Sequence, residues 1–282
     1  MKRIYAAVLL AVLFAFAPAV EAQREDWVTP FEAHRVVGPL YYVGTYDLGV
    51  FLLTSDEGHM LINTGLEDSA PLIKPSIEDL GFEYEDVKVL LTMQAHFDHV
   101  AAMATVQKET GAQVWATAED AKLLESGGAV DYLFGPKPSF APVRVDRRIQ
   151  DGEVLKLGDL EVTVILTPGH TFGSSSYSLT VEEGDESYNV LIANMNSVNP
   201  GTKFAGNEKY PNIVEDYTRG FEVQKGLDVD IWVAAHASQY GMHDKYSPGD
   251  EYDPERFVDP QGYEEAVAEY EERFLELVEA EK

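Results

Sequence analysis

Apolar side chains change their spacing several times along the chain, and each change predicts an element. In residues 41–43, 50–53 and 60–62 the apolar pattern is typical of short strands, with a hairpin turn at Asp56-Glu57-Gly58. Residues 69–80 have helical spacing and stop at Gly81. Residues 87–93 are almost continuously apolar, which indicates a strand buried on both faces.

Strand and helix patterns continue to alternate in the remainder of the chain. Residues 131–142 are rich in Pro, Gly and aromatic side chains and predict an irregular flap. Helices are predicted at 100–110, 117–127, 213–226 and 262–281, and strands at 113–116, 154–157, 160–166, 174–181, 188–193 and 230–235. Because both halves mix strands with helices and no linker separates them, we expect one α/β domain over residues 23–282, with two internal sheets covered by helices.

The first 22 residues have the pattern of a secretory signal peptide. Lys2 and Arg3 precede an apolar run at 4–16, and Val20-Glu21-Ala22 resembles a cleavage site. We expect cleavage after Ala22 and a periplasmic or secreted protein. An uncleaved anchor is the alternative.

The charge of the chain limits its partners. The net charge is −28, and removal of residues 1–22 leaves 19 basic and 48 acidic side chains, or −29. Such a surface repels nucleic acid and anionic membranes, so we expect neither as a partner once the signal is removed. It indicates either simple solubility or adaptation to high salt. The chain has no Cys, which excludes disulfides. We expect a monomer.

Metal-binding residue types follow three of the predicted strands. The segment Gln94-Ala95-His96-Phe97-Asp98-His99 comes directly after the strand at 87–93. His170 follows the strand at 160–166, and His236 follows the strand at 230–235. Imidazole nitrogens and carboxylate oxygens suit zinc, and ligands in α/β folds gather at the carboxyl ends of strands. The pattern therefore predicts a zinc site at one edge of the fold.

These motifs and their order resemble those of subclass B3 metallo-β-lactamases. The resemblance includes Tyr42-Val43-Gly44-Thr45, Ser126-Gly127-Gly128, Gly169-His170-Thr171 and His236-Ala237-Ser238, and it spans the chain from Trp27 to the C-terminal helix. It implies an αββα sandwich and hydrolysis of β-lactam antibiotics, which are small molecules. It also implies two groups of zinc ligands, the first formed by Gln94, His96 and His170, and the second by Asp98, His99 and His236.

Gln94 and Asn63 depart from the common pattern of that family. Gln94 stands where most members have a His, as in the GOB-like branch, which Ile192-Ala193-Asn194-Met195 also resembles. Because an amide oxygen is a poorer zinc ligand than imidazole, we expect one or two zinc ions, with the Asp98, His99 and His236 group binding more tightly. Asn63 replaces a common Asp, for which we expect only a structural role.

The resemblance also implies a mechanism and a set of substrate contacts. Hydroxide generated at the zinc attacks the lactam carbonyl, and Asp98 orients it. No Ser-x-x-Lys motif supplies an acyl-enzyme. Ser197 and Asn196 are expected near the substrate carboxylate, although Ser197 is as well explained as a loop residue bonded to its own backbone. Tyr132 and Phe134 are expected to form an apolar lid, or else to pack on the core.

Two other functions remain open at this stage. Glyoxalase-II-like thioesterases and lactonases share the His-x-His-x-Asp-His pattern, but they add an Asp that bridges two metals, and the chain has no carboxylate between residues 189 and 200. A non-catalytic zinc-binding envelope protein could use the same fold. The other histidines match no ligand position, and we expect them to be surface or structural; they are His34, His59 and His243.

Overall fold

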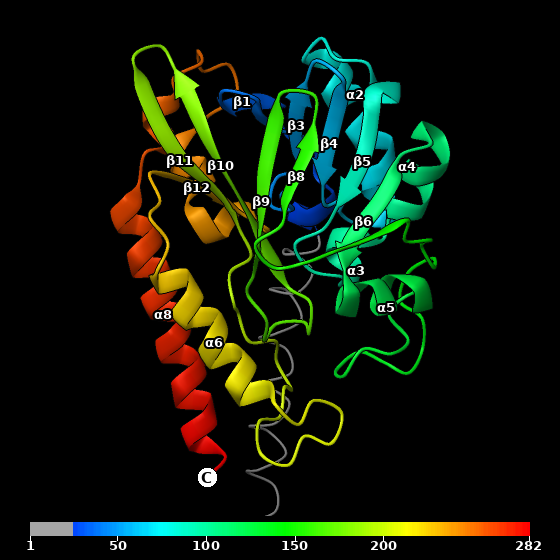
Figure 1. The fold of residues 1–282 in the computed structure, drawn as a ribbon, viewed down its shortest axis with the longest axis vertical. Coiled ribbons are helices and arrows are strands. Elements are labelled where there is room, and N and C mark those ends of the chain that lie inside the picture. The colour runs from blue at the N-terminus through cyan, green and yellow to red at the C-terminus, as the bar shows by residue number, and fades with distance from the viewer. Residues whose placement is uncertain (1–24) are drawn as a thin grey trace, which may run out of the picture.

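Two sheets form the centre of the molecule in the computed structural model, which describes residues 25–282 (Figure 1). The signal peptide expected at residues 1–22 lies outside the described residues. The seven-stranded sheet follows chain order: β1 (His34–Val37), β2 (Leu40–Tyr42), β3 (Phe51–Ser55), β4 (Gly58–Ile62), β5 (Val87–Leu91), β6 (Gln113–Thr117) and β7 (Arg147–Ile149). The five-stranded sheet has the order β12-β11-β10-β9-β8, from β8 (Val154–Leu157), β9 (Leu160–Leu166), β10 (Ser175–Glu183), β11 (Glu186–Ala193) and β12 (Ile231–Ala234).

Helices cover the outer faces of both sheets, which gives the αββα sandwich expected from the resemblance. On the seven-stranded side lie α2 (Ala70–Asp79), α3 (Phe97–Val100), α4 (Met103–Thr110) and α5 (Ala118–Ser126) (Figure 1). On the five-stranded side lie α6 (Ile213–Lys225) and the long α8 (Pro260–Ala280), while the short α7 (Met242–Lys245) follows β12. Within the described residues, no helix is both long enough and apolar enough to cross a membrane.

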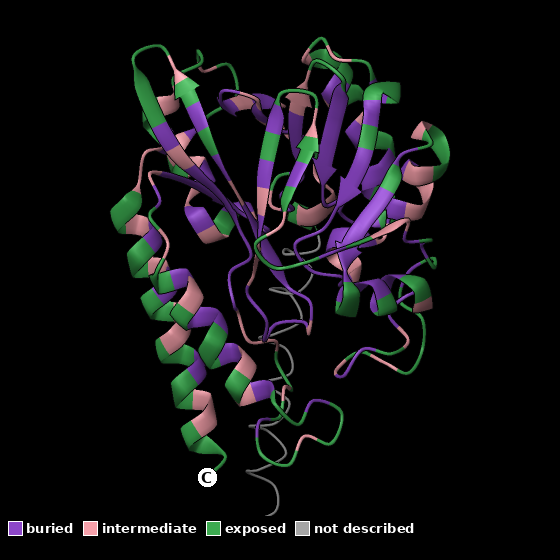
Figure 2. Cartoon of the chain, in the orientation of Figure 1, coloured by how far each residue is buried: buried purple, intermediate pink, exposed green. Residues whose placement is uncertain are grey.

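Alternation along the strands produces two hydrophobic layers. In β3, Phe51 and Leu53 point into the core between the sheets, whereas Leu52 points into the layer beneath α2 and α4. The strand interiors are buried, and exposed residues are concentrated on the outer helix faces and the hairpin tips (Figure 2). The sheets therefore provide a rigid support whose strand ends can carry a site.

The structure differs from the sequence prediction mainly around His99. The single helix expected at 100–110 is divided into α3 and α4. The His99 carbonyl accepts the backbone N–H groups of Thr64 (2.7 Å) and Gly65 (3.2 Å), which come from the loop after β4. This tertiary contact interrupts the helix and ties the ligand segment to the seven-stranded sheet. Strands β1 (four residues) and β7 (three residues) were not predicted from the sequence.

Candidate metal centre

The predicted ligand segments meet at one edge of the sandwich, beyond the carboxyl ends of strands from both sheets. Strands β9 and β11 run in the same direction because each is antiparallel to β10, and β12 is parallel to β11. The segments that follow these three strands therefore emerge at one edge. The segment after β5, in the other sheet, faces them and carries residues 94–99.

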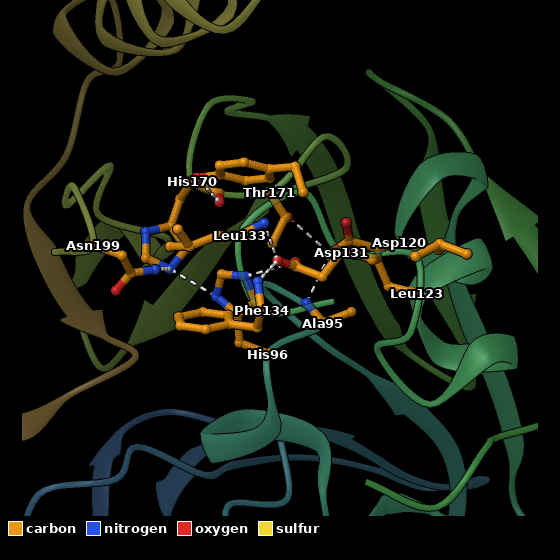
Figure 3. Close-up of polar contacts among 12 residues, drawn as sticks. Ala95, His96, Asp120, Leu123, Asp131, Leu133, Phe134, His170, Thr171 and Asn199 are labelled. Carbon is orange, nitrogen blue, oxygen red and sulfur yellow. Dashed lines mark hydrogen bonds and ion pairs between the residues drawn. The ribbon is translucent and has the colours of Figure 1, made fainter. Parts of the chain in front are cut away.

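The first half of the centre is formed by His96 and His170. His96 Nδ1 lies 3.1 Å from His170 Nε2, and both side chains are buried. Figure 3 shows His96 between His170 on one side and Asp131 on the other. Gln94 is also buried, and its Oε1 has no hydrogen-bond partner among the described residues. An unpartnered buried acceptor is costly unless a cation or donor satisfies it.

The second half is formed by Asp98, His99 and His236. Asp98 Oδ2 lies 3.3 Å from His99 Nε2 and 3.7 Å from His236 Nε2. One ligand atom from each of the three residues falls within 4.8 Å of the others. Neither ring nitrogen of His99 makes a hydrogen bond within the described structure. This half therefore presents a carboxylate and two imidazoles to a common point.

The electrostatics keep His99, His170 and Asp98 in their ligand forms. Burial lowers the pKa of His99 to about 4 and that of His170 to about 3, so both imidazoles are neutral at neutral pH. Burial alone would raise the pKa of Asp98, but the charges of the surrounding imidazoles outweigh burial and lower it. For His236, burial acts to lower the pKa, and the hydrogen bond to Asp47 together with nearby carboxylate charge raises it.

The hydrogen-bond partners of the imidazoles test whether a metal fits. His170 Nδ1 lies 2.7 Å from the Ser197 carbonyl, which can only accept, so this nitrogen carries the proton. His96 Nε2 likewise carries a proton toward Asp131, at 3.2 Å. When both rings are neutral, as metal ligation requires, their inward nitrogens are both lone pairs, only 3.1 Å apart. Two facing lone pairs beside an unpartnered amide oxygen fit a cation, as do the donors of the second half.

Asp120, which was not predicted from the sequence, connects two ligand-bearing loops. This buried carboxylate accepts the Ala95 N–H (2.9 Å), the Thr171 hydroxyl (3.1 Å) and the Gly173 N–H (3.0 Å). Ala95 lies between Gln94 and His96, and Thr171 follows His170. Burial raises the pKa of Asp120 to about 6, although these hydrogen bonds oppose the rise. The side chain therefore positions both loops of the first half.

The residues expected to contact substrate lie in different environments. Phe134 is 43% exposed and its ring lies edge-on to His96, with 5.1 Å between centroids, so it stands at the mouth of the centre. Ser197 is partly buried, and its carbonyl holds His170 and the Tyr217 hydroxyl. Asn196 is fully buried and Tyr132 is 6% exposed. Asn196 and Tyr132 therefore lie among the buried residues that surround the ligands, and their contact with substrate stays a prediction.

Asp47, Asp131 and Trp27 also belong to the centre and were missed. The Trp27 ring lies 5.6 Å from that of His236 and donates its Nε1–H to Asp47 at 3.1 Å. Asp47 is 189 positions from its partner His236 in sequence. No local motif marks these residues, because their role depends on contacts made only in the folded chain.

The remaining histidines do not take part in the metal group. His34 is stacked between Tyr42 and Tyr246, and His59 packs edge-on to Phe82. His243 stacks on Tyr46 and bonds to its carbonyl at 2.9 Å. Asn63 is structural as well: it has φ 64°, accepts from Thr92 and the Met93 N–H, and donates to the Gly49 carbonyl.

Curated relatives that match part of the chain include hydroxyacylglutathione hydrolases. The hydroxyacylglutathione hydrolase GloC of Haemophilus influenzae is 36% identical over 90 residues, covering 31% of this chain and 42% of that protein. The hydroxyacylglutathione hydrolase of Bradyrhizobium sp. strain BTAi1 is 29% identical over 165 residues, covering 57% of this chain and 56% of that protein. The chain thus spans about half the length of the curated relatives that it matches.

Solved structures match over nearly the whole chain. The metallo-beta-lactamase GOB-18 from Elizabethkingia meningoseptica is 42% identical with a TM-score of 0.88, covering 91% of this chain and 95% of that one. The class B3 di-zinc metallo-beta-lactamase LRA-12 from an Alaskan soil metagenome is 43% identical with a TM-score of 0.87, covering 89% and 96%. Residues 50–180 also match the model of the metallo-beta-lactamase superfamily. By fold, ligand arrangement and similarity, the chain belongs to the metallo-beta-lactamase superfamily.

Proposed function

We propose that this protein is a zinc-dependent β-lactamase that hydrolyses the lactam amide of β-lactam antibiotics. The observation that carries the proposal is the two-part centre. His96 and His170 face each other with lone pairs beside Gln94, and Asp98, His99 and His236 converge next to them. Similarity at 42% and 43% identity to two metallo-beta-lactamases along almost their full lengths supports the same substrate class.

Each half of the centre would hold one zinc ion. When bound, zinc lowers the pKa of water to about 7 and stabilises negative charge that develops on a substrate. Asp98 stays ionised at neutral pH because the nearby imidazoles lower its pKa, so its carboxylate can orient an attacking water by accepting a hydrogen bond. Phe134 lies edge-on to His96 at the mouth of the centre, where its exposed ring can contact a bound substrate.

The competing function is hydrolysis of a hydroxyacylglutathione thioester, which the curated relatives favour. Those relatives match about half of their own length, at 36% identity or less. The strand end at β11 continues as Asn194-Met195-Asn196-Ser197, without the carboxylate that would bridge two metals in such enzymes. This difference favours the β-lactamase. Without that carboxylate, Asp98 is the one negatively charged residue in the proposed ligand set.

Hydrolysis of the chromogenic β-lactam nitrocefin by purified protein tests the proposal. Turnover should be abolished by a chelator and restored by zinc. A hydroxyacylglutathione thioester assayed in parallel should be hydrolysed far more slowly. Zinc binding without hydrolysis of either substrate would instead indicate the non-catalytic zinc protein.

We also propose that the protein acts as an exported monomer and that it belongs to the GOB-like branch. Export rests on the pattern of residues 1–22, and the branch rests on Gln94. Cell fractionation with N-terminal sequencing of the mature protein tests export, with Gln23 expected as the first residue. Light scattering of the purified protein tests the monomer.

A further inference from the structure

Each half of the centre has a carboxylate behind one of its histidines. Asp131 stands behind His96 in the first half, and Asp47 stands behind His236 in the second. The Asp131 side chain is 3% exposed and the Asp47 side chain is 14% exposed. Neither carboxylate belongs to the expected ligand set. A carboxylate in this position fixes the tautomer and the orientation of a ligating imidazole.

The contacts of Asp131 assign its two oxygens to different tasks. Oδ1 accepts the backbone N–H groups of Leu133 and Phe134, both at 2.7 Å, and so holds the start of the flap. Oδ2 lies 3.2 Å from His96 Nε2. Because a carboxylate only accepts, the neutral His96 ring that a metal needs carries its proton on Nε2, and Nδ1 is then a lone pair facing His170.

Asp47 performs the same task with the opposite ring nitrogen. Its Oδ1 accepts the Ser238 N–H at 3.0 Å, and its Oδ2 accepts the Trp27 indole N–H at 3.1 Å. The same Oδ2 lies 3.0 Å from His236 Nδ1, so the proton of this imidazole resides on Nδ1. In the neutral ring that a metal needs, Nε2 is then a lone pair directed toward Asp98, 3.7 Å away.

We propose that Asp131 and Asp47 are positioning residues, and that each strengthens zinc binding only in its own half of the centre. Asp131 acts in the first half through His96, and Asp47 acts in the second half through His236. This inference rests on the zinc binding of the proposed function. The carboxylate behind the histidine matters more in the first half, because the ligands of that half are all neutral. There Asp131 supplies the negative charge that the ligands themselves lack, through the His96 ring.

Asp→Asn substitution reverses the tautomer with little change in shape. In Asp131→Asn, the amide oxygen keeps the two flap N–H groups, and the amide NH₂ then faces His96 Nε2. A donor at this point favours a lone pair on Nε2 and moves the proton to Nδ1, where it blocks the metal. Asp47→Asn acts in the same way through His236 Nδ1, and in addition the Trp27 indole N–H loses its acceptor. Loss of such a partner typically lowers metal affinity 10–100-fold.

The test is a zinc titration of the full protein against a chromophoric chelator. Asp131→Asn should weaken one of two zinc-binding events by about 10–100-fold and leave the other within the range of the control. Asp47→Asn should weaken the other event. Asp185→Asn, at an exposed aspartate in the β10–β11 turn, is the matched control and should change neither. Equal weakening of both events by Asp131→Asn would overturn the inference.

A double-mutant comparison separates positioning from general damage to the fold. In a His96→Ala background, Asp131→Asn should cause no further loss of zinc affinity, because its effect passes through the His96 ring. Asp47→Asn should still weaken the remaining zinc. A further loss from Asp131→Asn in this background would show a structural role and refute the inference. If the unaltered protein binds no zinc, both the proposed function and this inference are wrong. If it binds zinc and Asp131→Asn does not alter that binding, only this inference is wrong.

Discussion

Replacement of Asp120 should destabilise the protein in a graded order. Asp120→Ala leaves the buried N–H groups of Ala95 and Gly173 without an acceptor, while the Thr171 hydroxyl still reaches Ser174 Oγ at 2.7 Å. Two orphaned donors at about 1–3 kcal/mol each give a loss of about 4 kcal/mol. In a chain of this size that corresponds to a decrease of about 8–16 °C in Tm.

Asp120→Asn should lie between the native protein and Asp120→Ala. An amide oxygen turned toward Ala95 and Thr171 keeps two of the three hydrogen bonds, and only the Gly173 N–H faces a donor. The expected loss is about 1–3 kcal/mol. Urea and thermal unfolding of metal-free protein measure both variants, with Asp185→Ala as the exposed control. If Asp120→Ala melts no lower than Asp185→Ala, the carboxylate does not hold the two loops together.

The pH dependence of this comparison has a definite sign. Burial raises the pKa of Asp120 to about 6, above the value of about 3.9 for an unfolded Asp, so the folded protein binds this proton more tightly. The stabilisation is present below about pH 4 and is lost as the pH rises through 6. The stability advantage over Asp120→Asn, which does not titrate, should therefore grow from pH 7 to pH 4, by up to about 3 kcal/mol. A shrinking advantage would contradict the assigned burial effect.

Three further results are expected. Gln94→His should tighten binding of the weaker zinc, because imidazole replaces an amide oxygen; an unchanged affinity of the weaker site in a zinc titration would show that Gln94 is not a ligand. Asp98→Ala should reduce nitrocefin hydrolysis about 100-fold or more, whereas His243→Ala should not; equal losses would mean that the site is misassigned. Raising sodium chloride from 0.1 M to 1 M should raise Tm, because the Debye length falls from about 10 Å to about 3 Å and self-repulsion is screened; a flat or falling Tm would leave solubility as the role of the acidic surface.

The sequence predicted the ligand-bearing elements because their signals are local. The strand at 87–93 is almost continuously apolar, and the segment with His96, Asp98 and His99 follows it directly. The same holds for His170 after β9 and His236 after β12. The αββα architecture and the helices at α2, α5, α6 and α8 followed from periodicity, capping residues and the family resemblance.

The supporting contacts could not be predicted because they join residues that are remote in sequence. Asp47 reaches His236 across 189 positions, and Asp120 reaches Ala95 across 25. The break between α3 and α4 likewise depends on the loop after β4, whose N–H groups capture the His99 carbonyl. The burial of Asn196 and Tyr132 follows from packing against other loops, which periodicity does not report.

The most direct test of the central claim is the zinc dependence of β-lactam hydrolysis by the purified full-length protein. Metal-free protein should not hydrolyse nitrocefin, and activity should appear in proportion to added zinc, while a hydroxyacylglutathione thioester remains a far poorer substrate by kcat/KM. Nitrocefin turnover by protein shown to be metal-free, or efficient thioester hydrolysis without β-lactam hydrolysis in the zinc-loaded protein, would contradict the account.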